Sequence, residues 1–419
     1  MTTRTRHLLA GAVAIAALMA GPAFAAELPP GTMITKENLD KVKTDTFEGK
    51  TIASMLPAVV EMQVRDWGLR IKLRKSEPVP PDERYMEATR KYSGDVKFDP
   101  QTRNVSGYKA GFAFPVIDPK DPHAGDKVMW NYHVGAPLGQ AGSVRGMTFL
   151  LVDGNKGIEQ TQKWEWRRYF HVGHMDGTPT EGDGEVFSRT LMFASYPQDI
   201  RGLGTFTIRY MDADRVDDMW AYTKQTRRVR RVSGGGWMDP IGGTDMLQDD
   251  QDIWDAPPSW YKQVRLIEKR WILAVAHGLF PIDKAKMGSG EEFLHRDLKN
   301  PPYWNPLMEW EPREVWVVEG ITPDEHPYSK KIVYVDAEAN RVLLGEAYDR
   351  KGDFWKFFNW HNTRFVGDDN FRTMIPNSGE VIDFKRRHAT AWVGDSTVND
   401  KSLTSENVTL ERLRQGTAP

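Results

Sequence analysis

The stretch that decides the fold runs from Gly204 to Val232 and reads GTFTIRYMDADRVDDMWAYTKQTRRVRRV. Phe206, Ile208 and Tyr210 alternate with polar residues, which is the period of two expected for a strand with one apolar face. After an acidic turn, Trp220 and Tyr222 share a face of a second strand. The stretch therefore predicts a β-hairpin.

The turn of this hairpin contains Asp212, Asp214, Asp217 and Asp218. Aspartate side chains accept hydrogen bonds from the backbone of their own turn, which favours a plain loop. A calcium loop is the alternative, but its spacing requires Gly at the sixth place and Glu at the twelfth. This chain has Asp217 and Thr223 at those places, so we favour the plain turn.

The first 25 residues have the features of a secretory signal peptide. Arg4 and Arg6 precede an apolar run over residues 8–20, and Ala23-Phe24-Ala25 forms an A-x-A cleavage site. We therefore expect cleavage after Ala25 and a mature protein in the periplasm. No later run approaches the roughly 20 apolar residues that span a bilayer. The chain has no cysteine, which excludes disulfides, thiolate metal sites and a lipid-modified cysteine.

The net charge and the aromatic content indicate which partners and surfaces to expect. Without Arg4 and Arg6, 54 basic residues stand against 58 acidic ones, a net charge of about −4, which makes nucleic acid an improbable partner. The 18 Phe, 13 Tyr and 15 Trp residues indicate large buried or half-buried aromatic surfaces.

The chain divides into four parts. After the signal peptide (1–25), residues 26–95 predict an extended lead-in and two helices, from Thr51 to Trp67 with a break at Pro57 and from Pro81 to Gly94. Residues 96–395 predict a large antiparallel sheet that forms one domain with these helices. Residues 396–419 form a polar tail with a short helix around Leu410 and Leu413.

Short apolar runs between turn residues mark the strands of this sheet. They are Gly111–Pro115, Lys127–Tyr132, Gly146–Val152, Gln162–Val172, Arg189–Phe193, Val264–Ile267, Arg313–Glu319, Lys330–Asp336, Arg341–Tyr348 and Phe354–Trp360. Residues 233–262 predict a long ordered loop, and loops of this length are uncommon unless they are functional.

Two motifs are candidates for a catalytic or metal site. His171 and His174 lie on opposite faces of a predicted strand, without the pattern of a zinc protease, so hydrogen-bonded histidines are favoured over a metal site. Gly394-Asp395-Ser396 has the look of a serine hydrolase element, but all ten histidines precede it, so a turn after a strand is favoured. We predict no cofactor, no metal and no catalytic residue.

An arginine cluster follows the second strand of the hairpin at Arg227, Arg228, Arg230 and Arg231. Ion pairing with the nearby aspartates is the simpler interpretation, because surface pairs of this kind are common. The alternative is a rim that binds an anionic headgroup or carboxylate, which Arg binds in a bidentate manner.

At these residues the sequence resembles the family called domain of unknown function 1329, within the superfamily of periplasmic lipoprotein carriers and outer-membrane lipoprotein receptors. The matching elements are Gly111–Pro115, Trp130-Asn131, Arg209–Asp212, Asp217–Tyr222, Arg227–Arg231 and Gly242–Asp245. The resemblance implies a mainly β fold of the α+β type, an incomplete antiparallel β-barrel wrapped around helices with an apolar cavity. It also implies partners, namely an efflux-type inner-membrane transporter and an outer-membrane protein.

We therefore expect a carrier of a hydrophobic ligand that makes transient membrane contact. A carrier needs an apolar cavity and no catalytic group, and we found no activated nucleophile. The alternatives are a periplasmic esterase-like hydrolase with a lipophilic substrate and an envelope scaffold with exposed apolar patches.

Strand alternation leads to a hypothesis for the ligand site, although sequence alone leaves open which face points inward. We expect the apolar faces of the hairpin to line the cavity and the arginine cluster to lie at its rim. Phe354, Phe358 and Trp360 share a face near the end of the barrel. The expected ligand-binding residues are Phe206, Ile208, Tyr210, Trp220, Tyr222, Phe354, Phe358, Trp360, Arg228 and Arg230.

Overall fold

The structure is a computed structural model that describes residues 25–135, 138–180, 184–223, 228–232, 235–279, 293 and 295–415. Within these ranges one sheet of 15 strands dominates the chain. Its order is β1-β4-β14-β15-β16-β17-β18-β19-β7-β8-β9-β10-β11-β12, with β13 paired to β14 beside this path. Neighbouring strands are antiparallel except for β4 and β14, which are parallel.

The strands of this sheet differ widely in length. They are β1 (Met33–Ile34), β4 (Ile71–Leu73), β7 (Ala141–Asp153), β8 (Gly157–Phe170), β9 (Val186–Tyr196), β10 (Gly204–Tyr210), β11 (Asp218–Thr223), β12 (Arg228–Val232), β13 (Gln263–Ala274), β14 (Glu309–Ile321), β15 (Tyr328–Asp336), β16 (Val342–Asp349), β17 (Phe354–Val366), β18 (Arg372–Asp383) and β19 (His388–Val398). Two small hairpins stand apart, β2 (Thr46–Phe47) with β3 (Lys50–Thr51) and β5 (Lys97–Phe98) with β6 (Val105–Ser106).

Six α-helices accompany the strands in the described ranges. They are α1 (Leu39–Val42), α2 (Ile52–Met55), α3 (Ala58–Asp66), α4 (Glu83–Tyr92), α5 (Ala124–Val134) and α6 (Leu410–Gln415). The break between α2 and α3 lies at Leu56 and Pro57, as predicted from the proline. At α4 the Asp82 carboxylate accepts a hydrogen bond from the Arg84 N–H and caps the first turn. The predicted helices are thus confirmed.

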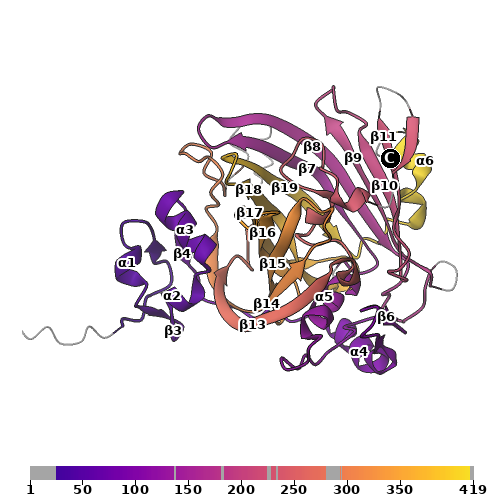
Figure 1. Cartoon of the computed structure of the whole chain (residues 1–419), viewed down its shortest axis with the longest axis horizontal. Coiled ribbons are helices and arrows are strands. Elements are labelled where there is room, and N and C mark those ends of the chain that lie inside the picture. Colours follow the sequence, from indigo (N-terminus) through magenta and orange to yellow (C-terminus); the bar gives the residue numbers. More distant parts are fainter. Residues whose placement is uncertain are drawn as a thin grey trace, which may run out of the picture.

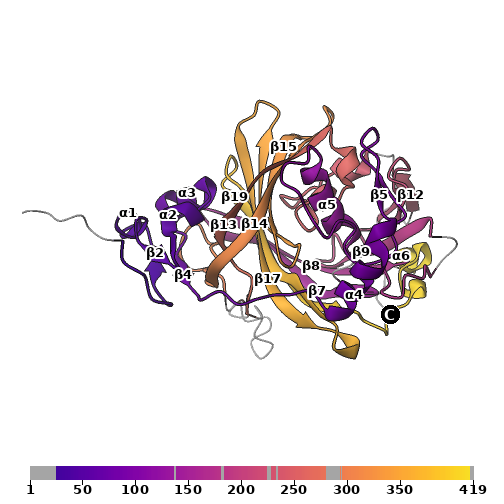
Figure 2. The same cartoon turned by 90° about the horizontal axis from the view of Figure 1, so that it is seen from below.

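The sheet curves around α5 and is open in the described ranges (Figures 1 and 2). In Figure 2, α5 lies inside the curve, whereas α1–α3 lie beyond β13 and β14 on the other side of the sheet. Helix α6 lies against the outside of the sheet at the β9–β11 end. This arrangement confirms the predicted incomplete antiparallel barrel, which was expected to wrap around helices and encloses α5.

Apolar clusters lie on both faces of the sheet, which separates them. The concave cluster includes Trp130 of α5, Trp166 of β8 and Phe358 of β17. A second cluster behind the sheet joins α2 and α3 to residues such as Phe357, the chain neighbour of Phe358. A strand covered on both faces shows apolar residues at consecutive positions.

The structure corrects two predicted strands. Lys127–Tyr132 belongs to helix α5, and Gly111–Pro115 is irregular. Nearly every side of α5 is buried, including the Trp130 and Asn131 side chains. A helix that is buried all round shows no polar face, and its helical period is therefore hidden in the sequence.

The predicted hairpin is confirmed as β10 and β11, with Phe206 directly opposite Trp220. Their rings stack with centroids 5.7 Å apart. The signal-peptide prediction lies outside the described residues apart from Ala25. In the described part of the chain, no helix has the length and apolar character needed to cross a membrane.

Candidate functional site

An apolar cavity lies on the concave side of the sheet. It encloses about 860 Å³ of space between atoms, part of it open to solvent, and about 90 Å³ can hold the centre of a water molecule. Its apolar wall comes from three sources: β7–β9 (Val144, Met147, Phe149, Trp166, Met192), β16–β19 (Val342, Trp360, Ile375, Pro376, Trp392), and α5 with the segments around it (Tyr132, Leu138, Ile241, Met246). Six polar residues complete it: Ser143, Gln251, Asp252, Arg341, Asn362 and Ser396. Ligand sites are commonly of this kind, concave and apolar with a few polar groups.

A roomier hollow lies among loops near β5 and β6. About 650 Å³ of it can hold water centres, but its lining is largely polar or glycine, with Asp99, Lys109, Asp212 and Asp214 among its residues. An apolar ligand there would take water from these charged and amide groups without offering them hydrogen-bond partners, which is costly. The concave cavity is therefore the stronger candidate, although it is smaller.

Residues 235–262, which we call the floor loop, close one side of the concave cavity. Two glycines in the sheet allow this loop to approach. A Cβ atom at Gly320 would lie 2.1 Å from Trp254, and one at Gly345 would lie 2.5 Å from Ile253. Ile253 itself has a left-handed φ of 72°, which is unfavourable for a β-branched residue and persists only where the surroundings enforce it. The floor loop is thus packed closely against the concave face of the sheet as a fixed element.

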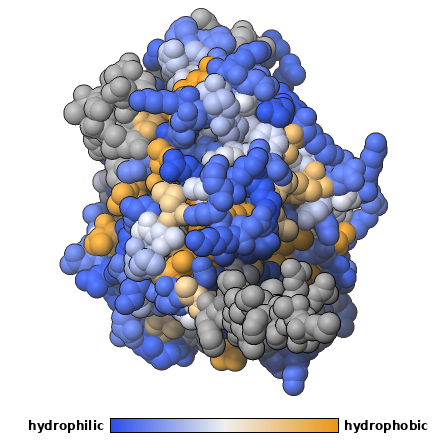
Figure 3. Space-filling model, turned by 90° about the vertical axis from the view of Figure 1, so that its left-hand side faces the viewer, coloured by the Kyte–Doolittle hydropathy of each residue, from blue (hydrophilic) through white to orange (hydrophobic). Residues whose placement is uncertain are grey.

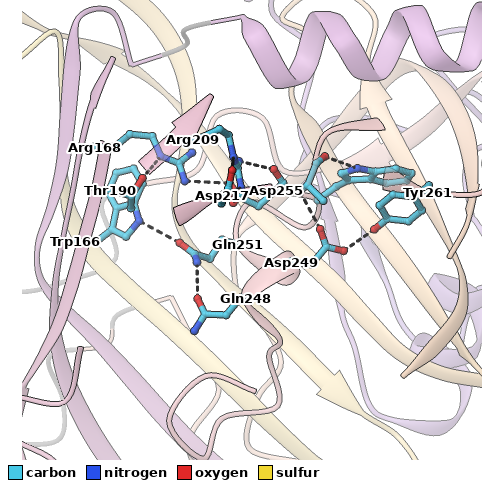
Figure 4. A network of polar contacts seen from close by, with 12 residues as sticks. Trp166, Arg168, Thr190, Arg209, Asp217, Gln248, Asp249, Gln251, Asp255 and Tyr261 are labelled. Atoms are coloured by element: carbon cyan, nitrogen blue, oxygen red, sulfur yellow. Dashed lines mark hydrogen bonds and ion pairs between the residues drawn. The ribbon is translucent and has the colours of Figure 1, made fainter. Parts of the chain in front are cut away.

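Two arginines on the sheet hold the floor loop through one carboxylate (Figure 4). Asp255 lies 3.0 Å from Arg168 and 2.8 Å from Arg209, and Arg209 also pairs with Asp217 at 2.8 Å. Burial alone would raise the pKa of Asp255, but the two guanidinium charges outweigh it and hold the pKa well below its usual range. The pKa of Asp217 is raised, because burial dominates there over the charge of Arg209.

A second buried cluster joins the floor loop to β15. The Lys331 ammonium has no exposed surface and lies 2.8 Å from Asp249 and 2.7 Å from Asp250. Tyr261 donates a hydrogen bond to Asp249, and Tyr328 donates one to Asp250 at 2.7 Å. Burial would lower the pKa of Lys331, but the two carboxylates raise it. Lys331 is therefore the cation that permits two buried carboxylates in one loop.

Arg341 is the positively charged residue in the cavity wall. Its side chain lies over the Tyr132 ring, with the guanidinium carbon 4.8 Å from the ring centre. Only 8% of the residue is exposed, and burial lowers its pKa. Asp252 faces the same cavity, and burial raises the pKa of its carboxyl against the opposing charges of Arg168 and Arg341.

The hairpin residues expected to line the cavity lie elsewhere. Phe206 belongs to the cluster under α6, with Leu403, Val408 and Leu413, and Ile208, Trp220 and Tyr222 pack against that cluster. Tyr210 is on the same strand face and donates a hydrogen bond to Asp218 at 2.7 Å. The other face of β10, with Thr207 and Arg209, points to the concave side. We expected the aromatic face of this hairpin to point into the cavity. The structure differs, because α6 covers that face.

The three aromatic residues of β17 that were expected to share a face lie on two different sides of the sheet. Trp360 lines the cavity, and Phe358 lies fully buried in the concave cluster beside it. Phe354 instead packs with the cluster behind the sheet, against Phe384. The register of β16 and β17 shifts between Ala347 and Tyr348. This irregularity interrupts the alternation of side chains along β17, from which the shared face was predicted.

The arginine cluster lies on β12 at one edge of the sheet. Arg228 and Arg230 are exposed, and Arg231 pairs with Asp218, whereas Arg227 lies outside the described residues. The pair of Arg231 with Asp218 agrees with the simpler interpretation. None of the described residues of this cluster lines the concave cavity.

The motifs weighed for catalysis do not form an active site in the described residues. Ser396 lines the cavity, but its hydroxyl lies 3.4 Å from the Pro376 carbonyl and no histidine lines the cavity with it. His171 contacts Thr180, and burial lowers its pKa to about 4, while His174 contacts the Phe170 carbonyl at 2.7 Å. No group of three or more metal-ligating side chains is found among the described residues.

Sequence reasoning missed a serine–histidine–carboxylate arrangement on β17 and β18. His361 Nδ1 lies 2.9 Å from Ser378 Oγ, and His361 Nε2 lies 3.3 Å from Glu380, which also binds Arg296. All four side chains are buried. Ser378 and Glu380 share one face of β18, and His361 lies opposite Ser378 on β17. The sequence alone does not show how β17 and β18 are aligned, so this arrangement could not be predicted.

Arg341 and the anchors of the floor loop were also missed as site residues. The unusual length of the loop and its aspartates did predict an ordered functional loop. Arg341 precedes an ordinary apolar strand, and nothing in the local pattern distinguishes it from a surface arginine.

A relative and a solved structure each match most of this chain. An uncharacterized protein of Pseudomonas aeruginosa is 23% identical over 364 residues, which cover 85% of this chain and 74% of that protein. Among solved structures, a DUF1329 family protein from Desulfovibrio piger shares 17% identity with a TM-score of 0.46, covering 71% of this chain and 99% of that one.

Two further solved structures resemble this chain more loosely. One is a putative outer membrane lipoprotein-sorting protein domain from Vibrio parahaemolyticus, with 17% identity, a TM-score of 0.43, and coverage of 66% of this chain and 92% of that one. The other is a LolA superfamily protein from Nitrosomonas europaea, with 12% identity, a TM-score of 0.39, and coverage of 69% and 98%. The family described as "Protein of unknown function (DUF1329)" matches residues 33–414, and the chain belongs to this family.

Proposed function

We propose that this protein is a periplasmic carrier that binds a hydrophobic ligand, such as a lipid, an acyl chain or another lipophilic compound, in the concave cavity. The observation that carries this proposal is the wall of the cavity, in which aromatic and methionine side chains from three parts of the fold converge. Each CH₂ group that such a wall removes from water contributes about 0.8 kcal/mol. The methionine side chains also fit irregular apolar ligands, because the thioether is flexible and polarizable.

The floor loop gives one side of the cavity a fixed shape. It contributes Ile241, Met246, Gln251 and Asp252 to the wall, and side-chain ion pairs join it to the sheet. We infer that the protein takes up the ligand in this cavity and passes it between an efflux-type inner-membrane transporter and an outer-membrane protein during transient membrane contacts.

Extraction of the purified protein tests the carrier proposal. Protein isolated from the periplasm of its host is extracted with organic solvent, and the extract is analysed by mass spectrometry. We expect a lipophilic compound in stoichiometric amount, absent from an extract of denatured and washed protein. An extract without any such compound, together with failure of the purified protein to bind fatty-acid probes, would contradict the proposal. Amino-terminal sequencing of the same material tests export and should begin at Ala26.

A hydrolase with a lipophilic substrate is the second candidate, and the Ser378–His361–Glu380 arrangement favours it. A nucleophile with a base and an orienting acid is the usual arrangement in such enzymes. Ser378 is only 1% exposed, however. In the hollow beside it, only about 10 Å³ can hold the centre of a water molecule, which leaves no room for a lipophilic substrate. Turnover of nitrophenyl esters that disappears in a folded Ser378→Ala variant would establish the hydrolase. Equal, background-level hydrolysis by wild type and variant would remove it.

An envelope scaffold would require broad exposed apolar patches. On the face shown in Figure 3, hydrophobic residues form small separate spots among polar ones. The exposed large apolar residues of the described chain, such as Val116, Ile158 and Leu307, come from separate segments of the chain. These observations favour the carrier over the scaffold.

A further inference from the structure

Arg341 differs from the other buried arginines of the described chain in having no acceptor. Arg209, Arg296 and Arg313 each bind carboxylates at 3.0 Å or less. The Arg341 guanidinium makes neither a hydrogen bond nor an ion pair with any described residue. Its contact is the face of the Tyr132 ring, at 4.8 Å. A guanidinium has five N–H donors and is costly to bury without oxygen partners.

The position of Arg341 connects it to the cavity. It lines the concave cavity and also a smaller hollow beside α4. Tyr85 and Phe371 are among the other residues that line this hollow. The adjacent residue Val342 belongs to the apolar wall. A ligand whose chain lies along that wall can therefore place its end group at Arg341.

A further donor of the cavity wall lies beside a carboxylate. The Trp360 indole N–H is buried and makes no hydrogen bond of normal geometry with a described residue, but it is close enough to Asp252 to lower the pKa of that carboxyl. A guanidinium group donates hydrogen bonds and cannot accept them. Arg341 therefore calls for an oxygen acceptor on the ligand. Asp252 is the one acid of the cavity wall and is not within ion-pair distance of Arg341.

We propose that the ligand is a single-chain amphiphile with an acidic headgroup, a carboxylate or a phosphate, which Arg341 binds in a bidentate manner while the chain lies against the wall of Trp and Met residues. This inference rests on the proposed carrier function and adds the chemical class of the ligand. Arg binds carboxylate and phosphate oxygens through two parallel N–H donors, and such bonds are stronger than neutral ones. The exposed Arg228 and Arg230 on β12 take no part in this contact.

Paired probes test the inference on the full mature chain. A dansyl-labelled undecanoic acid and its methyl ester are titrated into wild type, Arg341→Met and the control Arg364→Met, in which an exposed arginine of β17 is replaced. We expect wild type to bind the acid about tenfold or more tightly than the ester. Arg341→Met should weaken binding of the acid about tenfold and leave the ester within about twofold. Arg364→Met should match wild type for both probes.

Competition with the bound acid distinguishes the two headgroups and free anions. Oleate and oleoyl lysophosphatidic acid compete with the dansyl acid in wild type, and the tighter competitor identifies the preferred oxygen acid. Inorganic phosphate should not compete, because it lacks the chain. Displacement by inorganic phosphate alone would contradict an amphiphile and overturn the inference.

Two outcomes separate this inference from the carrier proposal. Equal affinity of wild type for the acid and its ester would overturn the role of Arg341 and leave the carrier standing; this comparison needs no variant, so it holds even if Arg341→Met does not fold. Failure of wild type to bind either probe would overturn both. Arg341→Lys keeps the charge without the bidentate geometry, and its affinity for the acid should lie between those of wild type and Arg341→Met.

Discussion

Replacing Lys331 by Met should destabilise the protein strongly, because it removes the cation from a cluster with no exposed surface. Lys331 Nζ donates to the Asp249 carboxylate at 2.8 Å and to the Ile253 carbonyl at 2.8 Å, and it lies 2.7 Å from Asp250. Methionine fills similar space, so the change acts through charge and hydrogen bonds. Breaking a buried pair by removing one partner typically costs about 3–5 kcal/mol.

The structure sets an upper limit on this cost. Without Lys331, two buried carboxylates remain side by side, and one of them can take up a proton. Protonating an aspartate of ordinary pKa at pH 7 costs about 4 kcal/mol, and at pH 5 the same step costs about 1.5 kcal/mol. The destabilisation should therefore be about 4 kcal/mol at pH 7 and shrink by about 2–3 kcal/mol at pH 5. A loss of packing alone would be the same at both values of pH.

Urea unfolding followed by tryptophan fluorescence measures this cost, since Trp237, Trp254 and Trp260 lie on the floor loop. Lys330→Met is the matched control. Lys330 is the next residue on β15, its side chain is 30% exposed, and it pairs with Glu319 at 2.9 Å, so its loss should cost about 1 kcal/mol or less. A Lys331→Met cost below about 1 kcal/mol, or one that does not change between pH 7 and pH 5, would refute the reasoning.

Three other predictions follow from the same structure. Burial lowers the pKa of His133 to about 3, below its ordinary 6.5, so the unfolded chain binds more protons between these values. The free energy of unfolding should therefore fall as the pH drops through this window, by up to about 1.4 kcal/mol per pH unit from this residue, and His133→Phe should flatten the dependence in urea titrations; an unchanged slope would count against it. Gly320→Ala should destabilise by about 1–3 kcal/mol, because the new Cβ would overlap Trp254, whereas Gly94→Ala, which meets no atom within 4 Å, should be nearly neutral in thermal unfolding; equal effects would argue against a closely packed loop. If the protein is a carrier, Ser396→Ala and His171→Ala should retain function in the host, and loss of function in folded Ser396→Ala would favour the hydrolase.

The hairpin shows what local alternation can and cannot predict. The period of two at Phe206, Ile208 and Tyr210 correctly predicted a strand and a shared face, because both depend only on the backbone of that strand. Which face points inward depends on α6, about 200 residues later in the chain. The local pattern of residues carries no information about contacts with so remote a segment. No residue of β10 is fully exposed, so no solvent-facing side marks the outer face of this strand.

The cavity shows the same limit for the site. Trp360 was predicted as a ligand-binding residue and lies in the wall, so we retain it in the proposed site. Met192, Trp392 and Arg341 join it only because β9, β16 and β19 come together in the folded sheet. Helix α5 was mistaken for a strand because its burial leaves no polar face. Order in the floor loop could be predicted, since its length and aspartates are local features.

The most direct test of the carrier asks whether filling the concave cavity abolishes ligand binding. Val342→Trp adds an indole to the cavity wall, while Ile208→Trp adds the same group on the opposite face of the sheet, against the cluster under α6. Binding of the dansyl acid is measured by fluorescence titration for wild type and both variants, after circular dichroism has shown each to be folded. We predict that wild type and Ile208→Trp bind with similar affinity and that Val342→Trp loses about tenfold or more. Undiminished binding by folded Val342→Trp, or loss of binding in folded Ile208→Trp alone, would contradict a ligand site in this cavity.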